Sequence, residues 1–377
     1  MSGGVDSSVS AHLLLQQNYR VTGVFMQNWD SRDENGSCPS EKDWIDVQRV
    51  CSHLGIQCYK VDYQKEYWVG VFDNFLDAYA RGATPNPDVD CNRVVKFGRF
   101  LDQFIRKDTA SPASCGDGDV GVQAICNTAD YIATGHYART RNSLLLRPTD
   151  SSKDQTYYLS TITSGALSRT LFPLGHLRKT EVKQLARDIN LPSSVSTKPE
   201  SMGICFVGKR PFNEFLNDYI APQPGLIRSI EDGTVMGTHQ GIWHFTVGQR
   251  ARVGGADVKW YVARTDLESS TVFIAPGRSH PSLFRSKLGV KTFHWIAGCA
   301  PPQFDETGTL QICAKYRYRT DAVPAILTRA AEKDDKDGGI SYDITFRDPQ
   351  LSVAVGQHVA LYDGDVCLGG GAIDSVA

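Results

Sequence analysis

The sequence predicts a mixed α/β protein, in which a domain built on a parallel sheet precedes a small linking domain and a C-terminal antiparallel β-barrel. In the first half of the chain, helical apolar stripes alternate with short apolar runs, as in sheets covered by helices on both faces. Glycines and short strand signals then replace this alternation, and strictly alternating runs follow. We place the three domains at residues 1–208, 209–277 and 278–377.

Helices and buried strands alternate through the first domain. Val5, Val9 and Leu13 share one helical face, and Gly55 suits the C-terminus of a second helix. A third apolar stripe ends near Gly82. Helices are expected over residues 5–13, 44–54 and 68–79, and strands over 21–26, 56–61 and 131–134.

The rest of the chain favours a short helix and many strands. The helix is expected over residues 212–220, and Asp363-Gly364 fits the tight turn of a hairpin. Residues 332–337 are charged and predict a solvated loop. Strands are expected over 291–295, 309–318, 325–327, 340–346 and 358–368.

Residues 106–128 lack any apolar periodicity and are rich in Ser, Ala, Gly and Asp. This composition predicts a surface insertion in the first domain.

The composition limits the classes of function. The net charge of −2 means that any nucleic-acid binding must use a local basic patch. No apolar run is long enough for a membrane span, and no signal peptide is recognisable, so no membrane partner is expected. The ten cysteines form no Cys-x-x-Cys pair, which favours a reducing compartment with mostly free thiols.

The run from Ser2 to Ser8 reads Ser-Gly-Gly-Val-Asp-Ser-Ser and precedes a predicted helix. Two glycines allow close backbone approach to a phosphate, and the helix N-terminus supplies N–H donors. The string lacks the lysine of a Walker loop. Taken alone, it is equally consistent with a plain turn that caps a helix. The string resembles the pyrophosphate loop of enzymes that split ATP into AMP and pyrophosphate.

Two further segments carry a cysteine beside unusual neighbours. Residues 84–92 read Thr-Pro-Asn-Pro-Asp-Val-Asp-Cys-Asn, a composition that predicts a loop stiffened by two prolines. Residues 201–206 include Cys205, and Lys198 precedes it closely enough to favour a thiolate. Seen alone, Cys91 and Cys205 would each be read as ordinary structural cysteines.

Together these segments resemble the tRNA-specific 2-thiouridylases of bacteria and mitochondria, over nearly the whole chain. The resemblance implies an ATP pyrophosphatase domain of the adenine nucleotide hydrolase type, a linking domain and a tRNA-binding β-barrel. It further includes residues 25–29, 133–137, 153–158, 245–250, 315–319, 356–357 and 366–371.

The resemblance also implies roles for individual residues. Cys91 matches the nucleophile and Cys205 the persulfide carrier, and Asp88 is expected to position the target base or move a proton. The ATP contacts would be Ser2, Gly3, Gly4, Val5, Asp6, Ser7, Met26 and Gly135. The tRNA contacts would be Asn86, Pro87, Asp88, His136, Lys153, Asp154, Gln155, Arg317, Tyr318 and Gln357.

The implied reaction is ATP-dependent 2-thiolation of a wobble uridine, in mitochondrial tRNAs for Lys, Glu and Gln. ATP adenylates the 2-oxygen, Mg²⁺ screens the pyrophosphate, and a persulfide on Cys205 supplies sulfur. An upstream sulfur-donor protein and a cellular reductant are the expected partners besides tRNA. The persulfide sulfur attacks the activated carbon either directly or after Cys91 attacks the persulfide and releases sulfide. Both routes can end in a Cys91–Cys205 disulfide, which requires Cα atoms less than about 7 Å apart.

Two other interpretations stay open. Another enzyme with a pyrophosphate loop, such as a tRNA lysidine synthetase, needs the glycine loop but not the cysteine pair. A non-catalytic RNA-binding homologue would retain the fold without the chemistry, and Asp6, Asp88, Cys91 and Cys205 argue against it.

The sequence departs from the family at two places. The family has an apolar strand before the glycine loop, whereas this chain begins at Met1, so we expect a gap in the sheet and an unanchored Ser2. Asp90 stands where an apolar residue is usual and is expected to raise the pKa of Cys91 unless it turns outward. The insertion at 106–128 favours a mitochondrial enzyme over one of the bacterial cytoplasm.

Overall fold

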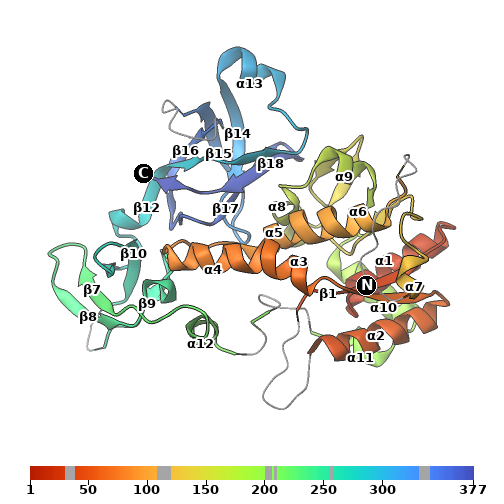
Figure 1. Cartoon of the computed structure of the whole chain (residues 1–377). Coiled ribbons are helices and arrows are strands. Elements are labelled where there is room, and N and C mark those ends of the chain that lie inside the picture. Colours follow the sequence, from red (N-terminus) through yellow and green to blue (C-terminus); the bar gives the residue numbers. More distant parts are fainter. Residues whose placement is uncertain (30–38, 108–119, 200–205, 208–209, 255–257, 331–339) are drawn as a thin grey trace. The chain divides into compact units, whose positions relative to one another are not determined.

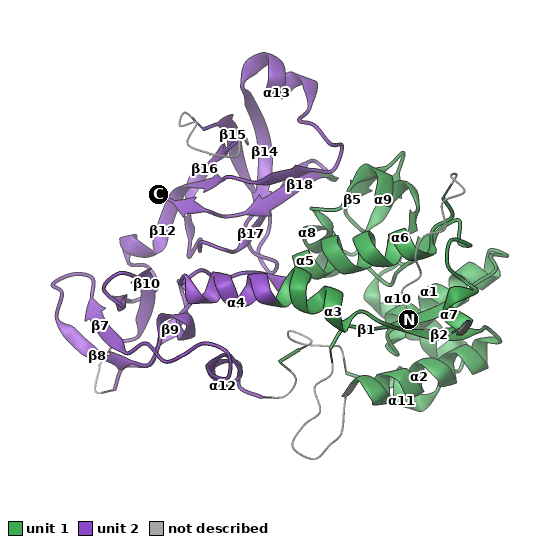
Figure 2. Cartoon of the chain, viewed as in Figure 1, with its two compact units in different colours: residues 1–72, 88–209, 365–367 green, residues 73–87, 210–364, 368–377 purple. Residues whose placement is uncertain are grey.

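The computed structural model describes residues 1–29, 39–107, 120–199, 206–207, 210–254, 258–330 and 340–377. The chain divides into two compact units, coloured separately in Figure 2. Unit 1 comprises residues 1–72, 88–209 and 365–367, and unit 2 comprises 73–87, 210–364 and 368–377. Cys205 and residues 108–119 of the expected insertion lie outside the described residues.

Unit 1 contains the predicted alternation of helices and parallel strands (Figure 1). Its helices are α1 (Val5–Gln16), α2 (Pro39–Leu54), α3 (Gln64–Tyr67), α5 (Pro87–Asp90, which begins at the last residue of unit 2), α6 (Leu101–Phe104), α7 (Val120–Gln123), α8 (Thr156–Leu159), α9 (Ser164–Ser168), α10 (Lys179–Asp188) and α11 (Ser193–Ser196), with the wider turns η1 (Trp68–Phe72) and η2 (Cys91–Phe100). Its strands are β1 (Gly23–Gln27), β2 (Cys58–Asp62), β3 (Ile132–Ala133), β4 (Arg139–Arg141), β5 (Leu144–Leu146) and β6 (Thr170–Leu171).

The parallel strands of unit 1 form two separate pairs. β1 pairs with β2, and β3 pairs with β6, both in parallel. Within the described residues no strand joins these pairs.

Ser2 is nevertheless anchored, contrary to expectation. The backbone N–H of Ser2 donates to the hydroxyl of Ser7 over 3.2 Å. The terminal amine of Met1 donates to the carbonyl of Val24 in β1. Burial lowers the pKa of this amine to about 6, which makes its charge easier to lose in this position. The loop is therefore held by its own side chains and by the edge of β1.

The prediction of a loop over residues 84–92 is wrong from residue 87 onward. Helix α5 begins at Pro87, and the helical run continues through η2 and α6 to Phe104. A proline at the first helical position loses no hydrogen bond and has the required φ, and Asp88 in the first turn favours the helix N-terminus. The prolines therefore start a helix here instead of stiffening a loop.

Unit 2 holds helices α4 (Asp73–Ala80), α12 (Phe212–Asn217) and α13 (Pro302–Thr307) and two sheets. The smaller sheet has the strand order β8-β7-β11-β10-β9. It consists of β7 (Gly225–Ser229), β8 (Val235–His239), β9 (Arg250–Ala251), β10 (Trp260–Asp266) and β11 (Thr271–Pro276).

The larger sheet of unit 2 is antiparallel, in agreement with the expected C-terminal barrel, and runs in the order β19-β12-β16-β15-β14-β17-β18. A core of large apolar side chains, among them Phe304, Leu327 and Ile344, lies against it. The predicted hairpin turn is present, and Gly364 has φ +54°. The strands are β12 (Phe284–Val290), β13 (Phe293–Trp295, paired with β18), β14 (Thr309–Lys315), β15 (Val323–Arg329), β16 (Tyr342–Leu351), β17 (His358–Asp363), β18 (Val366–Ala372) and β19 (Ser375–Val376).

The predicted boundaries between three domains stay a prediction. One boundary between the two compact units lies between residues 209 and 210, and both sheets that follow it belong to unit 2.

Candidate active site

The two glycines of the loop, Gly3 and Gly4, differ in backbone conformation and in the space around them. Gly3 has φ +67°, and a Cβ there would lie 2.7 Å from the carbonyl oxygen of Asp43. Gly4 has φ −108°, which any residue adopts, and a Cβ there would meet only the hydroxyl of Ser2 at 3.6 Å. The fold therefore requires glycine at position 3, whereas the missing side chain at position 4 leaves the backbone open to a ligand.

The N-terminus of α1 suits an anion. No side chain caps it, and Gly4 is its N-cap residue. The hydroxyls of Ser7 and Ser8 instead donate to the carbonyl of Gly4, over 3.1 and 2.9 Å. The first N–H groups of the helix, which lack helical partners, therefore meet no capping side chain, as the binding of a phosphate chain requires.

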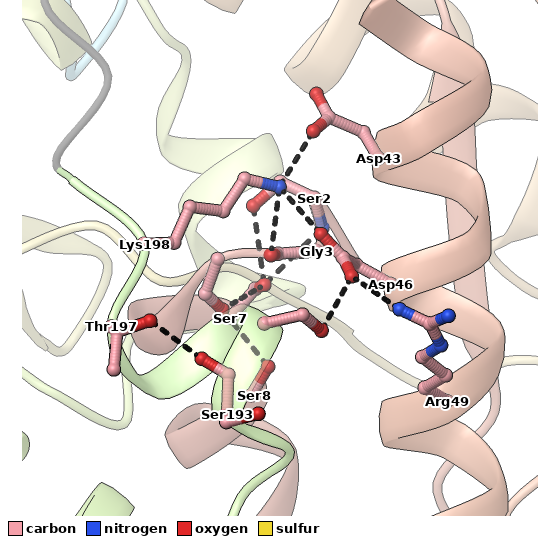
Figure 3. A network of polar contacts seen from close by, with 12 residues as sticks. Ser2, Gly3, Ser7, Ser8, Asp43, Asp46, Arg49, Ser193, Thr197 and Lys198 are labelled. Carbon is pink, nitrogen blue, oxygen red and sulfur yellow. Dashed lines mark hydrogen bonds and ion pairs between the residues drawn. The ribbon is translucent and has the colours of Figure 1, made fainter.

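A half-buried cation, Lys198, contacts the loop, as Figure 3 shows. The ammonium of Lys198 donates to the carbonyl of Gly3 over 3.2 Å, to Asp43 over 2.6 Å and to Asp46 over 3.0 Å. Ser194 of α11 also donates to Asp46, over 2.8 Å. Burial alone would raise the pKa of Asp46, but the hydrogen bonds from Ser194 and Lys198 outweigh it and lower the pKa.

The sequence assigned Lys198 to the environment of Cys205, whereas its ammonium contacts the glycine loop and α2. Asp43 and Asp46 were missed altogether. Their spacing of three residues puts both on one face of α2, but acidic pairs of this kind usually face solvent. The contact with Lys198 depends on the tertiary structure.

Asp6 lies in the first turn of α1 and is bound by two residues that the sequence did not single out. Lys179 donates to both carboxylate oxygens, over 2.6 and 2.7 Å, and the hydroxyl of Tyr137 donates over 3.0 Å. A Cβ on Gly135 would lie 2.9 Å from the backbone of Asp6 and Ser7. Gly135 therefore lets the β3 segment approach α1, next to the expected ATP contacts.

A metal ion at this site would have to take most of its ligands from outside the described side chains. Within the described ranges, no group of three His, Cys, Asp or Glu side chains converges on one point. Mg²⁺ usually takes only one or two carboxylates and completes its shell with water and substrate phosphates. Asp6, which is about one-third exposed beside the loop, is the carboxylate in the right place.

Cys91 follows Asp88 by three residues on the same helical run. The Cys91 thiol is buried, and the side-chain amide of Asn28 donates to its sulfur over 3.9 Å. Asp88 keeps contact with solvent, yet the protein packed around it desolvates the carboxyl and raises its pKa, and Lys96 partly offsets that rise. The pKa of Asp88 is therefore set by two opposing effects, desolvation and the charge of Lys96.

Asp90, next to Cys91 in the chain, is paired with a cation. Its carboxylate forms an ion pair with Arg93 at 3.2 Å, one helical turn further on. The expected effect of Asp90 on the pKa of Cys91 stays a prediction.

The residue after Cys205 is described and firmly packed. Phe206 is 1% exposed. Its ring lies 5.1 Å from that of Phe72, 5.6 Å from that of Trp29 and 6.0 Å from that of Tyr67. The distance between Cys91 and Cys205 stays a prediction.

The expected tRNA contacts of unit 1 are mostly engaged in the fold. Asp154 is buried and accepts from the N–H and hydroxyl of Thr156, over 2.9 and 2.5 Å. Gln155 accepts from the backbone N–H of Tyr137 over 2.8 Å. Lys153 is half-buried at the end of a single 3-10 turn, η3 (Ser151–Lys153). These side chains therefore shape their segment, whichever of them contacts tRNA.

His136 is half-buried between the rings of Phe97 and Phe172, at 6.0 and 6.3 Å. Desolvation, and secondly the charge of Lys96, lower its pKa well below the usual value. The imidazole is therefore neutral at physiological pH, and Thr134 shares a hydrogen bond with its Nδ1 over 2.9 Å.

The expected tRNA contacts of unit 2 also have structural partners. Arg317 donates to the carbonyl of Ser352 over 2.8 Å, and the ammonium of Lys315 lies 5.5 Å from the ring centre of Tyr318. The amide of Gln357 donates to the carbonyl of Thr84 over 2.8 Å, while the N–H of Thr84 donates to Val355 over 2.9 Å.

These last two contacts hold Thr84, which lies just before the expected base-contacting residues. Asn86 is half-buried, and Pro87 is buried at the start of α5. Met26, an expected ATP contact, is half-buried in β1 opposite Val61.

In the described parts of the chain, no helix has both the length and the apolar character needed to cross a membrane.

Comparison with known proteins gives three family matches. Residues 1–209 match the tRNA methyl transferase HUP domain, 213–276 the tRNA methyl transferase PRC-barrel domain, and 285–373 the aminomethyltransferase beta-barrel domain. The chain is 42% identical to the tRNA-specific 2-thiouridylase MnmA of Halalkalibacterium halodurans, over 100% of this chain and 94% of that protein. It is 43% identical to the protein of the same name in Ralstonia nicotianae, over 100% and 95%.

Proposed function

The chain belongs to the family of tRNA-specific 2-thiouridylases, and we propose from this membership that it is a tRNA-uridine 2-sulfurtransferase. Its substrate would be the wobble uridine of tRNA, and ATP would activate the base. The observation that carries the proposal is the arrangement of the glycine loop, in which position 4 is open to a ligand and no side chain caps α1.

The first step is transfer of AMP from ATP to the 2-oxygen of uridine, which turns a poor leaving group into a good one. The N–H groups at the start of α1 bind the departing pyrophosphate, and Lys198 holds Gly3 in the conformation that presents them. Mg²⁺, held by Asp6 and the phosphates, would supply charge screening. The target base leaves the anticodon stack to reach this site.

The second step brings sulfur to the activated carbon. A donor protein loads Cys205 as a persulfide, and the thiolate of Cys91 attacks the Cys205 sulfur to form a disulfide and release hydrosulfide. The hydrosulfide attacks C2 of the base, and AMP leaves with the bonding electron pair. A reductant then reopens the disulfide. Asp88, near Cys91 on the same helical run, positions the base or accepts its proton.

We propose the mitochondrion as the compartment, and its tRNAs for Lys, Glu and Gln as substrates. The insertion at 106–128 supports this choice, since such a segment is untypical of compact bacterial members. The named relatives are bacterial, so the alternative is a bacterial cytoplasm. Subcellular fractionation of the source cells decides between these locations.

The test of the proposed function uses Cys91→Ser and Cys205→Ser. Each variant is produced with its tRNA substrate, and 2-thiouridine is measured by mass spectrometry of digested tRNA. We expect loss of thiolation to below about a hundredth of wild type, because each sulfur takes part in bond making. Cys313→Ser, which replaces another cysteine, is the matched control and should thiolate normally. Wild-type levels of 2-thiouridine in either active-site variant would overturn the assignment.

A further inference from the structure

The carboxylate of Asp6 is the meeting point of two chains of hydrogen bonds within unit 1. Lys179 binds both of its oxygens, and the hydroxyl of Tyr137 binds one of them. The Lys179 side chain is 11% exposed and Tyr137 is 2% exposed, so neither contact is a flexible surface pair. Charge-assisted hydrogen bonds in such surroundings are strong and directional.

Both partners of Asp6 are tied in turn to the segment 150–155. The N–H of Tyr137 donates to the side chain of Gln155 over 2.8 Å, and the N–H of Gln155 donates back to Tyr137 over 3.1 Å. The N–H of Lys179 donates to the carboxylate of Asp150 over 2.9 Å. Lys179 therefore connects Asp6 to the start of the segment at Asp150, and Tyr137 connects Asp6 to its end at Gln155.

The segment itself is stiff. Asp150 accepts from the N–H and hydroxyl of Ser152, over 3.1 and 2.6 Å, and Asp154 holds Thr156 in the same way at the other end. A displacement of this segment is therefore not absorbed by its own backbone. It passes to Tyr137 and Lys179, and through them to Asp6.

We propose that Tyr137 and Lys179 are positioning residues that make the binding of ATP and of tRNA cooperative. The proposal rests on the proposed function, in which segment 153–155 contacts tRNA and Asp6 serves the nucleotide. A tRNA that displaces the segment on binding moves Tyr137 and Lys179 with it, and these bring Asp6 to the position that the bound nucleotide needs. By linkage, bound nucleotide must strengthen tRNA binding by the same factor.

The test measures this coupling directly. The dissociation constant of a non-hydrolysable ATP analogue with Mg²⁺ is determined with and without saturating unmodified tRNA, in wild type and in Tyr137→Phe. In wild type we expect tRNA to tighten nucleotide binding by roughly tenfold. Tyr137→Phe should bind each ligand alone within about twofold of wild type, since the backbone bonds to Gln155 remain, but its coupling factor should fall below about threefold.

A matched control separates this effect from the loss of any buried hydroxyl. Tyr63 is equally buried in unit 1, and its hydroxyl donates to Gln103 over 2.6 Å, without a link to Asp6. Tyr63→Phe should keep the wild-type coupling factor. Lys179→Met tests the second route and should also lower the coupling factor, whereas Lys179→Arg should restore most of it.

Three results would overturn the inference. They are a wild-type coupling factor of one, an unchanged factor in both Tyr137→Phe and Lys179→Met, or an equal loss in Tyr63→Phe. Each leaves the proposed function standing if the wild-type protein still thiolates tRNA. Absence of both tRNA binding and thiolation in wild type would instead remove the proposed function and this inference with it.

Discussion

Two lysines influence the site in different ways: one supports the glycine loop, and the other changes the pKa of Asp88 and His136. Lys198 joins Gly3 to two carboxylates of α2, and burial of the ammonium is outweighed by those carboxylates, so the pKa of Lys198 is raised. Lys96 acts differently: it is half-buried on η2, and its charge lowers the pKa of both Asp88 and His136. The two lysines lead to separate predictions.

Replacement of Lys198 with Met should destabilise the protein. Loss of the ammonium leaves the mostly buried Asp46 with fewer donors, and a hydrogen bond to a charged group contributes about 1.5–3 kcal/mol. Urea denaturation at pH 7 measures the effect as a lower midpoint. The control Lys65→Met removes an exposed lysine and should change the free energy of unfolding by less than about 0.5 kcal/mol.

The pH dependence of that difference has a definite sign. The folded-state pKa of Asp46 is below the usual value of 3.8, so its contribution is present above that value and is lost as the pH falls through the folded pKa. Wild type and Lys198→Met should therefore converge in stability toward strongly acidic pH. A difference that instead grows with acidification would contradict the ion-pair account.

Replacement of Lys96 with Met should move the acid limb of the pH–rate profile. Desolvation by the surrounding protein already raises the pKa of Asp88. Loss of the nearby cation raises it further, so the ionised carboxylate is reached only at higher pH. We expect the acid limb of kcat/KM for thiolation to shift to higher pH, with Lys65→Met unchanged. A shift toward lower pH would show that Asp88 is not the group that limits the rate.

At the scale of elements, the glycine loop and the helix that follows it work as one unit. Gly3 satisfies the fold, because only a residue without Cβ fits a φ of +67° against the carbonyl of Asp43. Gly4 satisfies no such requirement. The helical run from Pro87 to Phe104 likewise carries Asp88 and Cys91 on one element, so that their separation is set by a helix.

The two glycines predict opposite outcomes for the same substitution. Gly3→Ala should lower the free energy of unfolding by about 1–3 kcal/mol, because an L residue is strained there. Gly4→Ala should change that free energy by about 1 kcal/mol or less, yet weaken ATP binding at least tenfold, since its methyl group occupies the space left for phosphate. Calorimetry of ATP binding and urea denaturation of both variants provide the measurement. Normal ATP affinity in a folded Gly4→Ala protein would mean that the loop does not bind phosphate.

At the scale of the whole molecule, the organisation of the chain agrees with the family matches in kind. An α/β unit precedes two sheets of short strands, and the three matched family models follow one another without overlap. The net charge of −2 gives the molecule no global attraction for tRNA. Any recognition of tRNA must therefore rest on local groups. Three residues that the sequence predicts as tRNA contacts, Arg317, Asp154 and Gln155, already have hydrogen-bond partners within the fold.

The sequence by itself determined the fold class, the family, and the helices and strands with a clear apolar pattern, such as α1, β1 and β14. These features depend on local periodicity, turn residues and ordered motifs, which are read along the chain. It gave no ranges for the short helices α8 to α11 or for the strands β4 to β12. It failed at 87–92, where prolines also suit the start of a helix.

Only the tertiary structure decided which charges surround the glycine loop. Lys198 is far in sequence from Gly3, and Lys179 and Tyr137 are far from Asp6, so no spacing rule could pair them. Their contacts form because folding brings α2, α10, α11 and the β3 segment around the start of α1, where buried polar groups must find partners. The sequence thus predicted the phosphate-binding character of the loop, whereas the residues that hold it, Lys198, Lys179 and Tyr137, were found only in the structure.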